Sequence, residues 1–319
     1  MLLVILGAGA SYDSAWKHYF NTHPVEQYPW RPPLANHLFA RPAFEQLLGR
    51  YQDALAVVPD LVNIPEGSNL ERVMDGLQAE SSKHPQRTKQ LRAIRLYLRD
   101  LLTRCTGEWL RITSNVTNYY PLLDQLQQWK ERTKDDITIV TFNYDLLLED
   151  ALPTVGINLT ADINSYVVQD GWRIIKPHGS VNWAREAEAR DQLTDKYHVV
   201  DAYSFPGNMF PAIAMPVESV KDFECPNMHM RSLEDALQPG SWQLLVIGWK
   251  GTEKNFLEIL SRFVPRTSKL VTTIVCGTQA EAATTKNNLA SAIDLSHVTL
   301  YGAGFTEFVV RKDALKLLV

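Results

Sequence analysis

The sequence predicts an α/β protein in which a parallel sheet is interrupted by a helical insertion. Short apolar runs of strand length alternate with helical segments in the first and last parts of the chain. Between these parts, residues from about 34 to 134 show helical periodicity. Strands that alternate with helices form a parallel sheet that helices cover on both faces.

The first predicted strand, Leu2–Leu6, is apolar and runs directly into the sequence GAGAS. Later strand candidates are residues 137–141, 172–176, 242–247, 270–275 and 298–301. Helix candidates follow several of them, at residues 146–152, 253–263, 280–292 and 306–317. We therefore predict one Rossmann-like domain over residues 1–319, with the helical insertion as its subdomain.

The insertion is predicted from apolar residues that recur at three- and four-residue intervals. One series runs from Phe44 to Leu55 and another from Leu91 to Leu102. A proline-rich stretch at 27–33 and a polar stretch at 81–87 interrupt this pattern.

The composition is that of an ordinary globular protein, with 45% hydrophobic and 21% charged residues among 319. The net charge of −4 gives no electrostatic reason to expect a nucleic-acid partner. The apolar start lacks the basic region of a signal peptide, and no uncharged run is long enough to span a bilayer. Cys105, Cys225 and Cys276 are too far apart to indicate a disulfide framework or a zinc cluster. We expect a cytoplasmic protein without zinc.

The GAGAS motif, residues 7–11, lies where a phosphate-binding loop is expected, at the carboxyl end of a strand. Gly7 allows a tight turn, Gly9 allows backbone to approach a pyrophosphate, and Ser11 with the following helix start supplies donors. Tyr12 occupies the position of the usual third glycine. A strand-to-helix turn with small residues for packing is the alternative interpretation.

Two further motifs follow predicted strands. TFNYD, residues 141–145, places Asn143 and Asp145 where a strand ends and a helix begins, although either side chain could simply cap that helix. KPHGSVNW, residues 176–183, places His178 beside Gly179 at another strand end. A single histidine is more often structural than catalytic, but three strand ends now bring polar or flexible groups to one sheet edge.

In this order, and with the insertion between the first two, these motifs resemble the sirtuin-like proteins of bacterial antiphage defence systems. Looser supporting features are PPLANHL (32–38), NLERVMDGL (69–77), VIGWKGTEKNF (246–256) and GAGFTEFV (302–309). The resemblance implies that Asn143, Asp145 and His178 surround a nicotinamide ribose. The paired zinc cysteines of sirtuins and their loop after the glycine motif are not recognisable, and the defence branch shares both absences.

The resemblance further implies hydrolysis of NAD rather than deacetylation of lysine. Nicotinamide leaves as a neutral base, so the site must mainly stabilise a ribose that becomes cationic and deliver one water molecule to it. His178 would act as general base, Asn143 would orient water and ribose, and Asp145 would stabilise the cationic ribose or hold nearby backbone. The predicted substrate-binding residues are Gly7, Ala8, Gly9, Ala10, Ser11, Phe142, Gly179 and Gly248.

NAD is expected as substrate, with no further cofactor. A role in NAD depletion during phage infection implies control by a homo-oligomeric state or by an activating or sensor partner. A non-catalytic module that binds NAD or ADP-ribose is an alternative, as is a metabolic NAD hydrolase. A protein deacylase is disfavoured by the missing zinc cysteines. Trp16, Trp183 and Trp249 could stack on a base, although such aromatic residues more often belong to the core.

Overall fold

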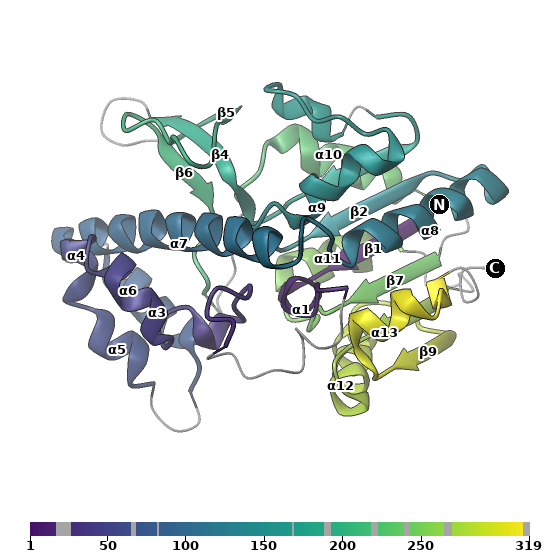
Figure 1. Ribbon diagram of the computed structural model, residues 1–319, viewed down its shortest axis with the longest axis horizontal. Helices are drawn as coiled ribbons and strands as arrows, with labels where there is room; N and C mark the ends of the chain where they lie inside the picture. Colours follow the sequence, from purple (N-terminus) through teal and green to yellow (C-terminus); the bar gives the residue numbers. More distant parts are fainter. Residues whose placement is uncertain are drawn as a thin grey trace.

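A six-stranded parallel sheet forms the centre of the protein (Figure 1). The computed structural model describes residues 1–16, 27–64, 68–81, 83–167, 169–187, 193–217, 223–238, 243–264 and 270–314. The strands are β1 (Leu2–Leu6), β2 (Ile137–Thr141), β3 (Trp172–Ile175), β7 (Gln243–Ile247), β8 (Val271–Val275) and β9 (His297–Tyr301). Each of the six predicted strands is confirmed, with ends that differ by no more than the usual one or two residues.

The strand order is β3-β2-β1-β7-β8-β9, which is the doubly wound order of a Rossmann-like sheet. Leu2 on β1 faces both Ile137 on β2 and Gln243 on β7. The order reverses between β1 and β7, and ligands of open α/β sheets bind outside the carboxyl ends of the strands at such a point. The predicted fold class is therefore confirmed.

Helices cover both faces of the sheet. All five residues of β1 are fully buried, and neighbouring residues on a strand point to opposite faces. The apolar run that predicted β1 thus has contacts on both sides, whereas the edge strand β9 is largely exposed or half-buried. The helices and short 3-10 turns outside the insertion are α1 (Ala8–Tyr12), α8 (Tyr119–Thr133), α9 (Leu147–Ala151), η2 (Leu152–Val155), η3 (Ile163–Tyr166), α10 (Asn227–Ala236), α11 (Lys254–Phe263), α12 (Gln279–Ala290) and α13 (Gly304–Val310).

The insertion has a hydrophobic core of its own. Its elements are η1 (Ala35–His37), α3 (Pro42–Leu48), α4 (Gln52–Leu55), α5 (Val58–Val62), α6 (Leu70–Ser81) and α7 (Pro85–Ile112). In Figure 1 α7 runs from this bundle to the sheet. Ile94 on α7 lies in the insertion core, whereas Trp109 near its end lies in the sheet core. Helix α8, also within the predicted range 34–134, packs in the sheet core.

A second, antiparallel sheet was not predicted. It consists of β4 (Gly179–Ala187), β5 (Leu193–Val199) and β6 (Phe210–Ile213), in the order β5-β4-β6. Val181 on β4 and Ile213 on β6 are buried in the insertion core. The small sheet therefore joins the insertion to the strand end that carries His178.

The last predicted helix is interrupted. Helix α13 ends at Val310, and Lys312 has a left-handed φ of +54°, which breaks the regular helix before residues 313 and 314 are helical again. Residues 315–319, which the prediction included, lie outside the described residues. Within the described ranges, no helix is both long and apolar enough to cross a membrane.

Candidate functional site

The glycine loop after β1 packs backbone to backbone against the loop after β7. The Gly9 amide donates to the Gly248 carbonyl at 3.0 Å, and Gly248 has a φ of +62°. A Cβ on Gly248 would lie 2.2 Å from the Ala10 nitrogen, and one on Gly7 would lie 2.6 Å from the Gly248 oxygen. The glycines are thus required for loop packing. Ala8 is exposed and Gly9 half-buried at this end of the sheet, and their contact with a diphosphate stays a prediction.

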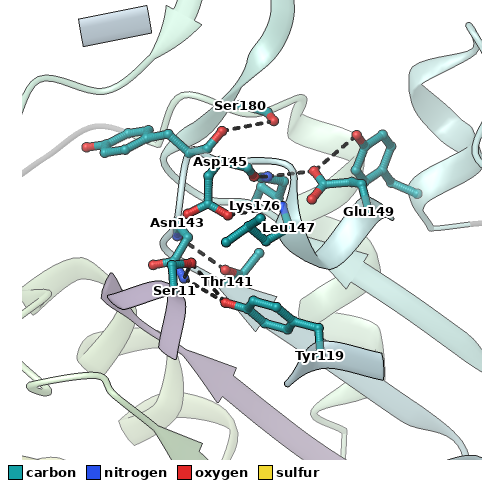
Figure 2. Close-up of polar contacts among 11 residues, drawn as sticks. Ser11, Tyr119, Thr141, Asn143, Asp145, Leu147, Glu149, Lys176 and Ser180 are labelled. Carbon is teal, nitrogen blue, oxygen red and sulfur yellow. Dashed lines mark hydrogen bonds and ion pairs between the residues drawn. The ribbon is translucent and has the colours of Figure 1, made fainter. Parts of the chain in front are cut away.

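Asn143 joins the loop after β2 to the glycine loop (Figure 2). Its Nδ2 donates to the Gly7 carbonyl at 3.0 Å and to Ser11 Oγ at 2.9 Å, and it lies 3.3 Å from the Tyr119 hydroxyl. The Gly7 carbonyl can only accept, so the amide nitrogen must face it and Oδ1 faces away. Asn143 is 6% exposed and does not cap a helix.

Asp145 accepts a main-chain hydrogen bond beside α9, as the alternative interpretation held, although the N-cap position itself is Leu146. Its Oδ1 accepts a hydrogen bond from the Leu147 amide at 3.1 Å, at the first turn of α9. Its main-chain carbonyl accepts a bond from Lys176 Nζ at 2.8 Å. Asp145 therefore holds the backbone that follows Asn143, which is one of the two roles predicted for it.

His178 lies against the loop that carries Asn143. Its ring centroid is 4.9 Å from that of Phe142 in an edge-on arrangement and 6.1 Å from that of Tyr144 in a nearly parallel one. These two aromatic residues flank Asn143 in the chain, so the structure brings the two candidate catalytic residues to one place. Gly179 has a φ of +80°, and a Cβ there would lie 1.8 Å from the Ala212 oxygen, so the turn after His178 requires glycine.

A cavity of about 330 Å³ opens beside His178. Glu71 reaches it from helix α6 of the insertion, and Glu253 and Lys254 line it at the start of α11. Phe256, also in its wall, packs edge-on against Phe142. The remaining lining residues are Val217, Phe223, Gly251, Thr252, Asn255, Leu257, Asn288 and Ser291. Of the three catalytic candidates, His178 lines the cavity and Asn143 and Asp145 do not, and the lining includes no residue of the glycine loop.

The three tryptophans that were considered for stacking on a base differ in their exposure to solvent. Trp183 is fully buried, and Trp249 is 2% exposed and stacks on Phe142 at 5.4 Å. Both belong to the core, as the alternative interpretation held. Trp16 is 43% exposed. Among the described residues, no group of three histidine, cysteine or acidic side chains is placed to hold a metal ion.

Three polar side chains of the site were not predicted. The Tyr119 hydroxyl lies 2.9 Å from Ser11 Oγ, and burial raises the pKa of Tyr119 well above its usual value. Lys176 and Glu149 form a buried ion pair of 2.6 Å behind Asp145. Burial raises the pKa of Glu149, and the positive charge of Lys176 opposes that shift. The sequence signal that could have identified Lys176 is its position immediately before Pro-His-Gly.

Residues 137–292 match the family model described as the SIR2-like domain. This matched segment covers just under half of the chain. It begins with β2 and contains Asn143, Asp145, His178 and Gly248, whereas the glycine loop lies outside it. The hydrogen bonds of Asn143 to Gly7 and Ser11 therefore connect the SIR2-like segment to the start of the chain.

A solved structure described as "The Structural basis of Sirtuin Substrate Affinity" aligns with 98% of this chain and 92% of its own chain. The two are 14% identical, with a TM-score of 0.39. No curated protein matches this chain. The assignment of the fold rests on the strand order.

Proposed function

We propose that the protein is an NAD+ glycohydrolase that releases nicotinamide and ADP-ribose. The observation that carries this proposal is the junction at Asn143. Its amide is bonded to the glycine loop, and its two aromatic neighbours pack on His178. The SIR2-like domain that residues 137–292 match is a family of NAD-dependent enzymes. This match agrees with a dinucleotide substrate at the point where the strand order reverses.

The proposed chemistry does not require protonation of the leaving group, because nicotinamide departs as a neutral base. His178 takes a proton from the attacking water or from a ribose hydroxyl, as an imidazole does near neutral pH. Oδ1 of Asn143 faces away from the glycine loop and orients the ribose and the water. The loop from Gly7 to Ser11 holds the diphosphate.

The cavity beside His178 suits a substrate with a positive charge. Among the described residues of its lining, Glu71 and Glu253 bring two carboxylates and Lys254 brings one ammonium group. The nicotinamide ring of NAD+ is cationic before the reaction, and the ribose becomes cationic during it. Negative charge in a partly enclosed site stabilises both.

The test is NAD+ turnover by the purified protein, with nicotinamide and ADP-ribose followed by chromatography. His178→Ala is expected to reduce turnover by at least about 100-fold, as loss of a positioned acid–base group does. Asn143→Ala is expected to have an effect of about the same size, because it removes the group that orients water and ribose. Exposed Asn158→Ala and His297→Ala are matched controls that keep wild-type turnover. Activity that survives both site substitutions would show that the site is elsewhere. Tight NAD+ binding without turnover would instead favour a binding module.

We further propose that this activity serves antiphage defence by depleting NAD, under control of an assembled state or a partner protein. The support is the resemblance to the sirtuin-like defence proteins. Phage challenge of cells that express the wild type or His178→Ala tests it. The wild type is expected to reduce plaque formation and cellular NAD together, and the variant to do neither. Equal plaque formation in both strains would contradict the defence role.

A further inference from the structure

The ammonium group of Lys176 is buried between the two loops that carry the candidate catalytic residues (Figure 2). Lys176 is fully buried, and its Nζ donates to the Asp145 carbonyl at 2.8 Å and to Glu149 Oε1 at 2.6 Å. A buried ammonium group is costly unless it is paired and hydrogen-bonded, and both conditions are met here.

The position of this group in the chain gives it a geometric role. Asp145 follows Asn143 by two residues, and Lys176 precedes His178 by two residues. One ammonium group therefore connects the loop of the first catalytic candidate to the strand end of the second. The same segments are also joined at the Tyr144 carbonyl, which accepts bonds from the Val181 amide at 3.0 Å and from the Ser180 hydroxyl at 3.4 Å.

An ion pair that serves only stability can be replaced by apolar residues of similar volume, often without loss. This pair differs in one respect. The second bond of Lys176 goes to a main-chain carbonyl, which apolar replacement leaves without that donor. Replacement of both charged residues thus separates the two roles, because it removes the cost of the buried charges and also removes the connection to Asp145.

We propose that Lys176 is a positioning residue that sets the separation of Asn143 and His178, and that Glu149 orients it. The inference rests on the proposed hydrolase function for its kinetic consequences. Neither residue is placed to touch NAD. Loss of the connection should therefore reduce kcat with little effect on KM, because a displacement of about 1 Å can cost about 100-fold in rate.

The kinetic experiment compares the wild type, Lys176→Met, and the double variant Lys176→Met/Glu149→Met. The double variant is expected to unfold in urea near the wild-type midpoint, to lose about 100-fold in kcat and to change KM by less than about threefold. Arg173→Met is the matched control, since it removes the Arg173–Asp136 pair from the same strand β3, at the end away from the site. It should retain wild-type kcat.

Hydrogen exchange gives a readout that does not depend on NAD turnover. In the double variant, exchange of the Leu147 and Val181 amides, which bond to Asp145 and Tyr144, is expected to become at least about tenfold faster. Exchange in β1 should be unchanged. If the wild type proves inactive, this result still supports the positioning role while the hydrolase proposal fails.

Two results would overturn the inference. One is a double variant with wild-type kcat, or, if no form is active, with wild-type protection at Leu147 and Val181. The other is a double variant that loses stability and protection throughout the sheet, which would show that the pair is needed for folding and not for placing the two loops.

Discussion

At the scale of single residues, Asn143 is buried and its amide is bonded to other residues of the protein. Its Nδ2 is used by the glycine loop, which orients the amide and turns Oδ1 away from it. A residue of this kind has a fixed orientation before any substrate arrives. Preorganised dipoles of this sort stabilise developing charge without having to reorient during the reaction.

His229 offers a pH test of the folded state. It is fully buried on α10, its Nε2 donates to the Ile163 carbonyl at 3.0 Å, and burial lowers the pKa to about 4. The imidazole is neutral in the fold but takes up a proton in the unfolded chain below about pH 6.5. Its contribution to stability is therefore lost as pH falls from about 6.5 to about 4, by at most about 1.4 kcal/mol per pH unit.

The check is the free energy of unfolding in urea, measured from pH 7 to pH 4 for the wild type and His229→Gln. The variant keeps an N–H donor for Ile163 but cannot titrate, so its stability should fall less steeply with pH. His297→Gln, at an exposed position, is the control and should follow the wild type. Parallel curves for wild type and His229→Gln would contradict the assignment of a neutral buried imidazole.

Sequence patterns identified which residues come to the site but not how they are held. Asn143 and His178 are adjacent to strand ends, and the edge of a parallel sheet brings such positions together. Lys176 and Glu149 lie far apart in the sequence and are not neighbours within one helix or strand, so no periodicity predicts their contact. The same is true of Tyr119, which begins α8 beyond the insertion and reaches Ser11 only in the folded chain.

At the scale of elements, Gly248 is a position where a substitution is expected to disturb the packing of two loops. Its φ is +62°, and a Cβ would meet the Ala10 nitrogen at 2.2 Å. Gly248→Ala must displace the glycine loop or the end of β7, and we expect a loss of several kcal/mol in the free energy of unfolding.

Gly76→Ala is the matched control for that prediction. Gly76 is exposed within α6, and a Cβ there would meet nothing within 4 Å. Alanine in the interior of a helix is more favourable than glycine by about 0.5–1 kcal/mol, so this variant should be slightly more stable than the wild type. Urea unfolding measures both. Wild-type stability in Gly248→Ala would show that the two loops are not held in contact.

Most of the strands that the sequence predicts well are buried on both faces, and the edge strand β9 is an exception. The parallel strands are short apolar runs, and their alternation with helices is enough to identify the sheet. The small sheet of β4, β5 and β6 escaped prediction because its strands carry charged residues such as Arg185 and Glu186 and are not uniformly apolar. Its register also shifts between Arg185 and Ala187, which disturbs simple alternation.

At the scale of the whole molecule, Asp13 connects the two ends of the described chain. Its Oδ2 accepts bonds from the amides of Phe305 at 2.6 Å and Thr306 at 3.2 Å, and its Oδ1 accepts one from the Thr306 hydroxyl at 2.7 Å. Asn118, at the start of α8, donates to the Asp13 carbonyl and to the Thr306 hydroxyl. The segment after the glycine loop is thereby fixed to the first turn of α13.

Asp13→Asn is expected to destabilise the protein by about 2–4 kcal/mol, because an amide has one acceptor oxygen where the carboxylate has two, and buried donors are left unsatisfied. Urea unfolding measures the loss, and hydrogen exchange should show faster exchange within α13. Asp53→Asn, at an exposed position on α4, should leave both unchanged. Unchanged exchange in α13 of the Asp13 variant would show that this connection contributes little.

The contacts of Asp13 also set the order in which the site matures during synthesis. Residues 305 and 306 are translated almost 300 positions after Asp13, an interval of roughly 15–60 s at about 5–20 residues per second. The pairing of strand β1 with β7 is delayed as well, because β7 begins only at Gln243. Asn143 and His178 are translated about midway through that interval, before the glycine loop has all the contacts that fix it. Almost the whole chain therefore has to be synthesised before the candidate site can take its final form.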